Sequence, residues 1–170
     1  MSPEEKLTRW MQQWGTDVLR LCRANLRDAQ LAEDAAQETF CKAWRRAEHF
    51  QPASEAHERA WLLRIAVNVC RDLRRSAWWR HEDRRVAPED LPPALTAVSD
   101  ENRDLAALVD ALPEKLRLPV LLHHLTGLSL ADTARSLGIS RPTLNKRLRE
   151  AYRCLAVQWQ EEDFHDAEQP

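Results

Sequence analysis

The chain has 170 residues, of which 44% are hydrophobic and 31% charged, a balance typical of a soluble protein with one or two small domains. It contains only three glycines and few runs of alternating β-branched residues, so we predict an all-α fold. No apolar run approaches the ~20 residues of a membrane span, and the N-terminus lacks a signal peptide. We therefore expect no membrane insertion and a cytoplasmic location.

The net charge of −2 conceals an uneven distribution of charged residues. Residues 1–86 carry 16 Lys and Arg against 13 Asp and Glu, whereas residues 87–170 carry 9 against 14. Any argument for nucleic-acid binding must therefore come from local patches. The four cysteines have no CxxC spacing, which favours small core residues over metal ligands or disulfides. We predict no metal site and no cofactor. The cysteines are Cys22, Cys41, Cys70 and Cys154.

Two helices are predicted at the N-terminus. The first covers residues 8–26, with Leu19 and Cys22 on its buried face and Trp10 and Trp14 as core contacts. Asp28 is placed to cap the next helix, at residues 31–47. Small and aromatic residues repeat along that helix at i, i+3 and i+4 and predict its buried face. They are Ala32, Ala35, Ala36, Thr39, Phe40, Ala43 and Trp44. The outer face runs from acidic to basic, an order that the helix dipole explains without invoking function.

A loop at residues 49–59 leads into a helix over residues 60–75. One side of this helix is apolar at Leu62, Ile65, Ala66, Val69 and Leu73. The opposite side, called here the basic stripe, consists of Trp61, Arg64, Asn68, Arg71 and Arg75. Cations, an amide and an aromatic ring on one side suit a nucleic-acid backbone and its bases. With Phe50 from the loop, this side could stack and hydrogen-bond an unpaired base. A solvated surface helix is the alternative interpretation of the stripe alone.

The clearest boundary follows this helix, which we expect to fray after Arg75. Residues 86–94 are rich in proline and acidic side chains, so residues 86–99 are predicted to be an extended linker between two small helical domains. The domains would cover residues 1–85 and 100–158. Residues 159–170 form an acidic tail.

The second domain is predicted to contain a helix-turn-helix. A short helix ends near Leu112, and a second runs from Pro113 to about Leu125, with a bend at Pro119 or a start nearer Leu118. Ser129 should cap a helix over residues 130–137, and Ser140 a last helix over residues 141–157.

The turn between these last two helices carries the residue pattern of a helix-turn-helix. Ala134, Gly138 and Leu144 supply the small crossing residue, the positive-φ turn and the apolar plug that a helix-turn-helix needs. The exposed N-terminal half of the last helix would enter a DNA major groove. Its residues are Arg141, Thr143, Asn145, Lys146 and Arg149. A plain helical hairpin is the alternative.

With both halves in view, the chain resembles the extracytoplasmic-function (ECF) group of bacterial sigma-70 factors, the promoter-recognition subunits of RNA polymerase. Residues 34–45, DAAQETFCKAWR, are similar to the core-binding motif of region 2.2. Residues 61–68, WLLRIAVN, resemble the promoter-melting segment of regions 2.3 and 2.4. Residues 112–115, LPEK, followed by GLS at 127–129, Ala134 and LGIS at 137–140, resemble region 4. Region 2 would then cover residues 1–85 and region 4 residues 100–158.

The resemblance implies three sets of contacts. Core polymerase, through the β′ clamp helices and the β subunit, would bind Asp34, Gln37, Glu38, Lys42 and Arg45. The minus-ten element would be captured and held by Phe50, Trp61, Arg64, Asn68, Arg71, Arg74 and Arg75. The minus-35 element would be read by Arg141, Thr143, Asn145, Lys146 and Arg149, with Arg147 on phosphate. The resemblance also implies an anti-sigma factor as a partner.

Four positions depart from the family pattern. Pro142 stands where glycine is common, Asn145 where Lys or Arg is common, and Glu150 and Tyr152 where arginines are frequent. Proline is tolerated in a first helical turn. Asn145 could pair with adenine rather than guanine, a change worth ~1–3 kcal/mol of discrimination.

Two other classes of function remain as alternatives. A helix-turn-helix regulator that binds duplex DNA without polymerase would leave the basic stripe without a role. An enzyme would need a phosphate loop, metal-ligand spacing or a nucleophile with its base, and the sequence has no such signature. We therefore predict that the chain is not an enzyme.

Overall fold

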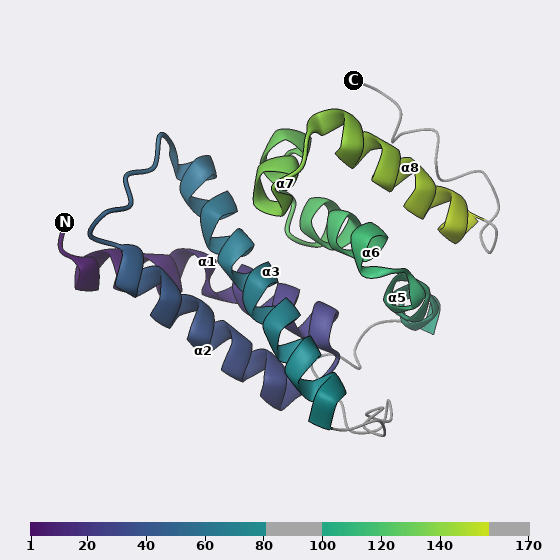
Figure 1. Ribbon diagram of the computed structural model, residues 1–170, viewed down its shortest axis with the longest axis horizontal. Helices are drawn as coiled ribbons and strands as arrows, with labels where there is room; N and C mark the ends of the chain where they lie inside the picture. Colours follow the sequence, from purple (N-terminus) through teal and green to yellow (C-terminus); the bar gives the residue numbers. More distant parts are fainter. Residues whose placement is uncertain (81–99, 157–170) are drawn as a thin grey trace.

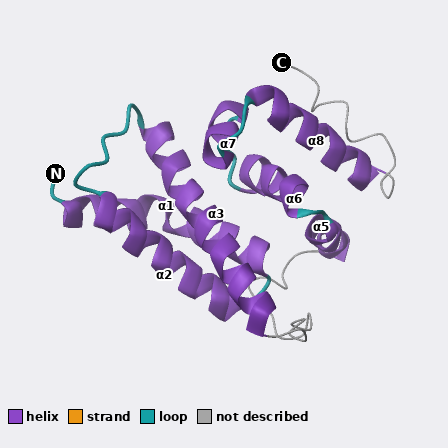
Figure 2. Cartoon of the chain, viewed as in Figure 1, coloured by secondary structure: helices purple, strands orange, loops and turns teal. Residues whose placement is uncertain are grey.

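The computed structural model describes residues 1–80 and 100–156, and that part of the chain is helical without any strand. The predicted all-α fold is confirmed (Figures 1 and 2). The helices are α1 (Pro3–Leu26), α2 (Ala29–Arg46), α3 (Glu55–Arg80), α5 (Asp100–Ala111), α6 (Glu114–Val120), the π-helix η2 (Leu121–Leu125), α7 (Leu130–Leu137) and α8 (Arg141–Ala156). The predicted linker at 86–99 and tail at 159–170 lie outside the described residues.

Side-chain caps fix where the first three helices begin. Ser2 and Glu5 form a capping box, so α1 begins at Pro3 rather than at residue 8. Asp28 caps α2 as predicted and accepts a hydrogen bond from the Leu31 amide at 2.9 Å. The Ser54 hydroxyl accepts from the backbone amide of His57 at 3.1 Å, and α3 therefore begins at Glu55 instead of residue 60. Its other end reaches Arg80, so the predicted fraying after residue 75 is wrong.

The N-terminal half, residues 1–80, is a three-helix bundle whose core includes both predicted tryptophans. Trp10 and Trp14 are buried, and the whole apolar side of α3 is buried except Leu73, which is partly exposed. Two expectations about burial are wrong. Leu19 is only partly buried, because the buried face of α1 runs through Val18 and Leu21. The side chain of Trp44 is 44% exposed and is therefore not part of the buried face of α2.

The cysteines divide into two classes. Cys22 and Cys70 are buried core residues as predicted, whereas Cys41 and Cys154 are exposed on α2 and α8. The expectation that all four lie in the core is therefore wrong for two of them.

The C-terminal half, residues 100–156, contains the predicted helix-turn-helix. Ala134 and Leu144 are buried in one cluster, and Gly138 ends α7 with a φ of 66°. Pro119 lies inside α6 without ending it, and the chain continues directly into the wide turns of η2. The predicted bend or later start is thus replaced by a change of helix type. There the amide of Thr126 bonds to the Leu121 carbonyl, five residues back, at 3.2 Å.

The two halves pack against each other, which the sequence did not predict. Helix α3 lies between α1 and α2 on one side and α7 on the other (Figure 1). Four leucines of the C-terminal half join the core of the N-terminal half, and these are Leu118, Leu121, Leu122 and Leu128. Burial of α3 therefore extends beyond its predicted apolar side, to Leu63 and Val67.

Candidate polymerase and nucleic-acid interfaces

The loop before α3 and the start of α3 form an aromatic cluster. The rings of Phe50 and Trp61 are stacked, with centroids 3.7 Å apart and planes at 11°. Trp10 packs against Trp61 at 5.5 Å, and His57 meets Phe50 edge-on at 6.0 Å. The structure thus brings together the two aromatic residues predicted to receive an unpaired base. Since each ring already covers one face of the other, a base would have to stack on the outside of the pair or displace one ring.

Two side chains that the sequence analysis missed hold this cluster in place. Glu58 is 3% exposed, and its carboxylate accepts from the Trp10 indole nitrogen at 2.7 Å. The Lys6 ammonium donates to the carbonyl of Ala47 at 2.7 Å and to that of Phe50 at 3.3 Å. Glu58 sits among the first-turn acids of α3, where a role in the helix dipole is the default interpretation. No local signal identifies Lys6, because its acceptors lie more than 40 residues away.

The basic stripe follows one side of α3, as predicted. Arg64, Asn68 and Arg75 are exposed, and Trp61 is partly exposed. At 1.5 Å of rise per residue, the amide of Asn68 lies about 10 Å along the helix from the aromatic pair. That spacing can present an amide and successive cations to one extended strand.

One cation on this side of α3 already has a partner. The Arg71 guanidinium pairs with the Glu114 carboxylate of α6 at 2.5 Å. A hydrogen bond from the Cys22 thiol, whose own pKa is raised, is the main cause of a lowered pKa of the buried Cys70 thiol. The positive charge of Arg74 contributes to the same lowering.

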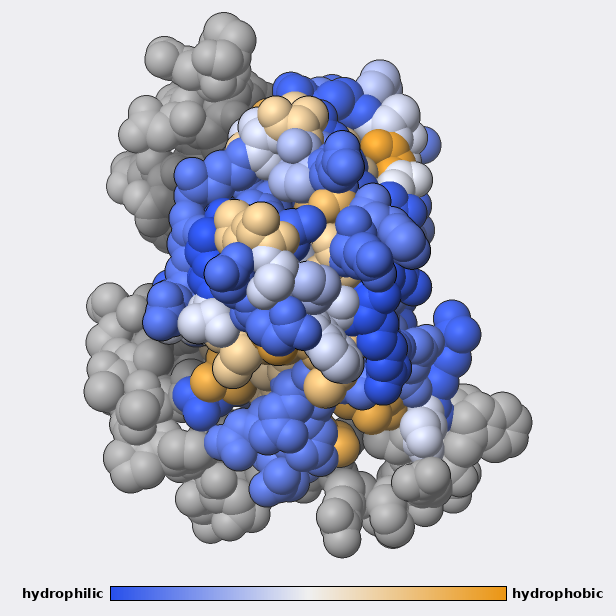
Figure 3. Space-filling model, turned by 90° about the vertical axis from the view of Figure 1, so that its left-hand side faces the viewer, coloured by the Kyte–Doolittle hydropathy of each residue, from blue (hydrophilic) through white to orange (hydrophobic). Residues whose placement is uncertain are grey.

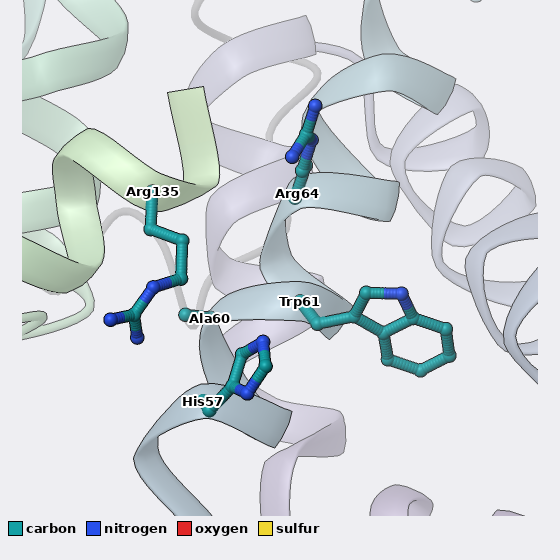
Figure 4. A pocket seen from close by; sticks show the side chains of 5 residues that line it. All are labelled: His57, Ala60, Trp61, Arg64 and Arg135. Carbon is teal, nitrogen blue, oxygen red and sulfur yellow. The ribbon is translucent and has the colours of Figure 1, made fainter. Parts of the chain in front are cut away.

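A small cavity lies where α7 meets α3 (Figure 4). His57, Ala60, Trp61 and Arg64 of α3 line it together with Arg135 of α7, and its volume is about 40 Å³. This volume holds a few water molecules and is far too small for a nucleobase. The cavity is therefore a packing gap between the two halves and no binding pocket of its own.

The predicted polymerase-binding residues share the outer side of α2. Asp34, Gln37 and Arg45 are exposed, and Glu38 and Lys42 are partly exposed. Glu38 lies 3.9 Å from Lys42 and 4.0 Å from Arg45, as measured between charged atoms. Exposed pairs of this kind stabilise a helix by at most ~1 kcal/mol, so these side chains are free to exchange partners. From the N-terminal side, the surface is largely hydrophilic with small, separate apolar patches (Figure 3).

The predicted DNA-reading residues lie on α8, whose buried side is Leu144, Leu148, Ala151 and Leu155. Exposed or partly exposed side chains cover the rest of its first three turns. These include Arg141, Thr143, Asn145, Lys146, Arg147 and Arg149. The Ser140 hydroxyl caps the helix by accepting from the Thr143 backbone amide at 3.3 Å, and it donates to the Thr143 hydroxyl at 2.9 Å. The Arg149 side chain donates to the backbone carbonyl of Asn145 at 3.3 Å, and Asn145 itself is partly exposed.

Family models and relatives match both halves in the same order. Residues 10–80 match sigma-70 region 2, and residues 102–155 match sigma-70 region 4. The ECF RNA polymerase sigma factor SigL of Mycobacterium tuberculosis is 33% identical over 138 residues, which cover 79% of this chain and 77% of SigL. SigM of the same organism is 34% identical over 140 residues, covering 81% of this chain and 68% of SigM.

Solved structures share the fold. CnrH, in a complex with the cytosolic domain of CnrY, matches with a TM-score of 0.70 and 23% identity over 98% of this chain and 91% of CnrH. RpoE of Bartonella quintana, in a complex with the anti-sigma factor NepR, matches with a TM-score of 0.73 and 21% identity over 93% of this chain and 99% of RpoE. With region 2 and region 4 matched in sequence and a common helical fold, the chain belongs to the ECF group of the sigma-70 family.

Proposed function

We propose that this chain binds core RNA polymerase and directs promoter-specific initiation by recognising the minus-35 and minus-ten elements and melting the latter. One observation carries the proposal. A charged outer side of α2, a basic and aromatic side of α3 and an exposed N-terminal half of α8 occur in one family-matched chain. The stand-alone regulator is not favoured, because it would need neither of the first two surfaces.

The N-terminal half would carry the polymerase contact and the melting step. The outer side of α2, from Asp34 to Arg45, would dock on the β′ clamp helices. Phe50, Trp61 and Asn68 would trap unstacked bases of the minus-ten element, and each stacking contact is worth ~1–3 kcal/mol. Binding energy of this size offsets the cost of strand opening, so the chain itself would carry out no chemistry.

The C-terminal half would anchor the polymerase upstream. Arg141, Lys146 and Arg149 are exposed on α8 and would make phosphate and base contacts in the major groove of the minus-35 element. Asn145 would contribute a preference for adenine. We also propose that an anti-sigma factor regulates this chain, since similar folds occur in complexes with such partners. Such a chain would act in the cytoplasm, and none of its described helices is long and apolar enough to cross a membrane.

A footprint compares the proposal with the alternative. Promoter DNA should be protected over both elements by the chain together with core polymerase, with little protection by the chain alone. Protection of a palindromic duplex site by the isolated chain, unchanged when polymerase is added, would favour the stand-alone regulator and overturn the proposal.

A further inference from the structure

A buried carboxylate lies behind the aromatic cluster at the start of α3. Glu58 is 3% exposed, and its Oε1 accepts from two donors of α1, the Trp10 indole nitrogen at 2.7 Å and the Arg9 guanidinium at 2.5 Å. Trp10 is itself fully buried and packs against Trp61 with ring centroids 5.5 Å apart. A continuous line of contacts therefore runs from Glu58 through the Trp10 ring to Trp61, one of the residues proposed to stack on an unpaired base.

The dipole of α3 does not explain why this carboxylate is buried. Glu55, the other acid in the first turn of α3, is exposed and interacts with the dipole from the surface. Burial of a carboxylate carries a desolvation cost that only well-placed donors offset, and a buried indole N–H needs an acceptor. Apolar side chains at positions 10 and 58 would fill the same space without either requirement. What the polar pair adds to the packing is a single orientation of the Trp10 ring, because its N–H must point at Glu58.

The second ring of the stacked pair is held from the same helix. The Lys6 ammonium donates to the carbonyl of Phe50 at 3.3 Å and to that of Ala47 at 2.7 Å. Lys6 and Trp10 are four residues apart and therefore share one face of α1. The first turns of α1 thus contact both the loop and the start of α3, whose rings at Phe50 and Trp61 stack with centroids 3.7 Å apart.

We propose that Glu58 is a positioning residue for base capture. By fixing the Trp10 indole, it holds Trp61 in the orientation in which Trp61 and Phe50 form a preformed stacking platform for an unpaired base. This inference rests on the proposed role of the aromatic pair in minus-ten recognition. A base that reaches a preformed platform does not have to order the two rings, so more of the stacking energy appears as affinity. Without the carboxylate, the strand keeps its phosphate contacts and loses its stacking contact.

Two oligonucleotide probes separate stacking from charge. One is an oligothymidine of about 12 nucleotides, and the other is an abasic sugar-phosphate chain of the same length, with the same phosphates and no bases. Both carry a dye and are titrated with the full chain while fluorescence anisotropy is recorded. The ratio of the two affinities, called here the base dependence, reports stacking, since every base has a π face and the phosphate contribution is common to both probes.

Two variants remove opposite ends of the same hydrogen bond, namely Glu58→Leu the acceptor and Trp10→Phe the donor. Each should lower the base dependence about five- to twentyfold, the lower part of the range for one base–aromatic contact, and leave affinity for the abasic probe unchanged. Glu58→Gln should keep the base dependence of the wild-type chain, because its amide oxygen can accept from the same donors. If Glu58→Leu does not fold, Trp10→Phe and Glu58→Gln provide the same comparison.

Two control variants separate this role from general effects of charge and stability. Glu55→Leu removes the same charge from the same turn of α3, and Val18→Ala opens a cavity in the buried face of α1, about two turns from Trp10. Both should keep the base dependence of the wild-type chain. An equal fall in Val18→Ala, an unchanged value in Glu58→Leu and Trp10→Phe, or a Glu58→Gln variant as impaired as Glu58→Leu would each overturn the positioning role.

Failure of this role and failure of the proposed function give different results. Run-off transcription with core polymerase tests the function by itself. A chain that directs transcription and keeps its base dependence after loss of Glu58 refutes the positioning role alone. A chain whose base dependence falls with Glu58 but which directs no transcription refutes the function and leaves the positioning role in place. Equal affinity of the wild-type chain for both probes would overturn stacking at this pair and the role of Glu58 with it.

Discussion

The buried pair of Asn25 and Arg117 makes the packing of the two halves measurable as a coupling free energy. Replacing Asn25 by Leu removes one acceptor from a guanidinium that is 4% exposed and has one nitrogen already unpartnered. Loss of a partner from a buried charge typically costs 3–5 kcal/mol, and the remaining bond to the Leu112 carbonyl reduces this to roughly 2–4 kcal/mol. Replacing Arg117 by Met leaves the Asn25 oxygen unpaired and should cost ~1–3 kcal/mol.

The double variant, Asn25→Leu with Arg117→Met, should lose much less free energy of unfolding than the two single variants lose together. Both polar groups are then gone, and replacing both partners by apolar groups of similar shape is nearly neutral. We expect a coupling free energy of about 2 kcal/mol, within the range for residues in direct contact. Urea unfolding followed by tryptophan fluorescence gives the four free energies of unfolding.

The control pairs Asn25→Leu with Leu155→Ala, because Leu155 belongs to the separate cluster beneath α8. That combination should be additive to within ~0.5 kcal/mol. If the Asn25 and Arg117 variants are equally additive, α1 and α6 do not meet in solution, and the packing of the two halves against each other is refuted.

Three further predictions concern single positions. Asn68→Ala should slow open-complex formation roughly tenfold, from loss of one base contact, and leave core binding unchanged in a polymerase pull-down; equal loss of both would remove the residue from melting. Asn145→Lys should shift promoter preference at one step of the minus-35 element, as read by transcription from a randomised promoter pool, and an unaltered profile would contradict its readout role. Gly138→Ala and Gly127→Ala, both at positive φ, should each lower the free energy of unfolding by ~1–2 kcal/mol. Only the former adds a contact with α3, an ordinary van der Waals contact 3.4 Å from the Arg64 guanidinium, so it should cost no more than the latter; a larger loss would argue against that packing.

Sequence patterns predicted the structure correctly where the residues that determine it lie close together in the chain. The repeat on α3 identified Leu62, Ile65 and Val69 as core, and all three are buried. The spacing from Ala134 to Leu144 identified the helix-turn-helix, because the small residue, the turn and the plug lie within one short segment. Chain order and motif spacing then led to the family that the comparisons establish.

Contacts between distant segments were not predictable in this way. Arg117 has the pattern of a surface cation, yet the acceptor for its Nε lies 92 residues away on α1. Glu114 belongs to a family motif, but nothing in the sequence pairs it with Arg71. Trp44 was predicted to lie in the core because its spacing fits, yet its side chain is 44% exposed. Periodicity defines a face of a helix and does not identify what covers it.

Transcription by the reconstituted enzyme tests the central claim most directly. Purified chain is mixed with core polymerase and a library of genomic promoter fragments, and transcript start sites are mapped by run-off. We expect the chain to join the core and to direct initiation from a defined subset of fragments that share minus-35 and minus-ten sequences. Failure to bind core, or binding with no template opened, would contradict the assignment of this chain as a promoter-recognition subunit.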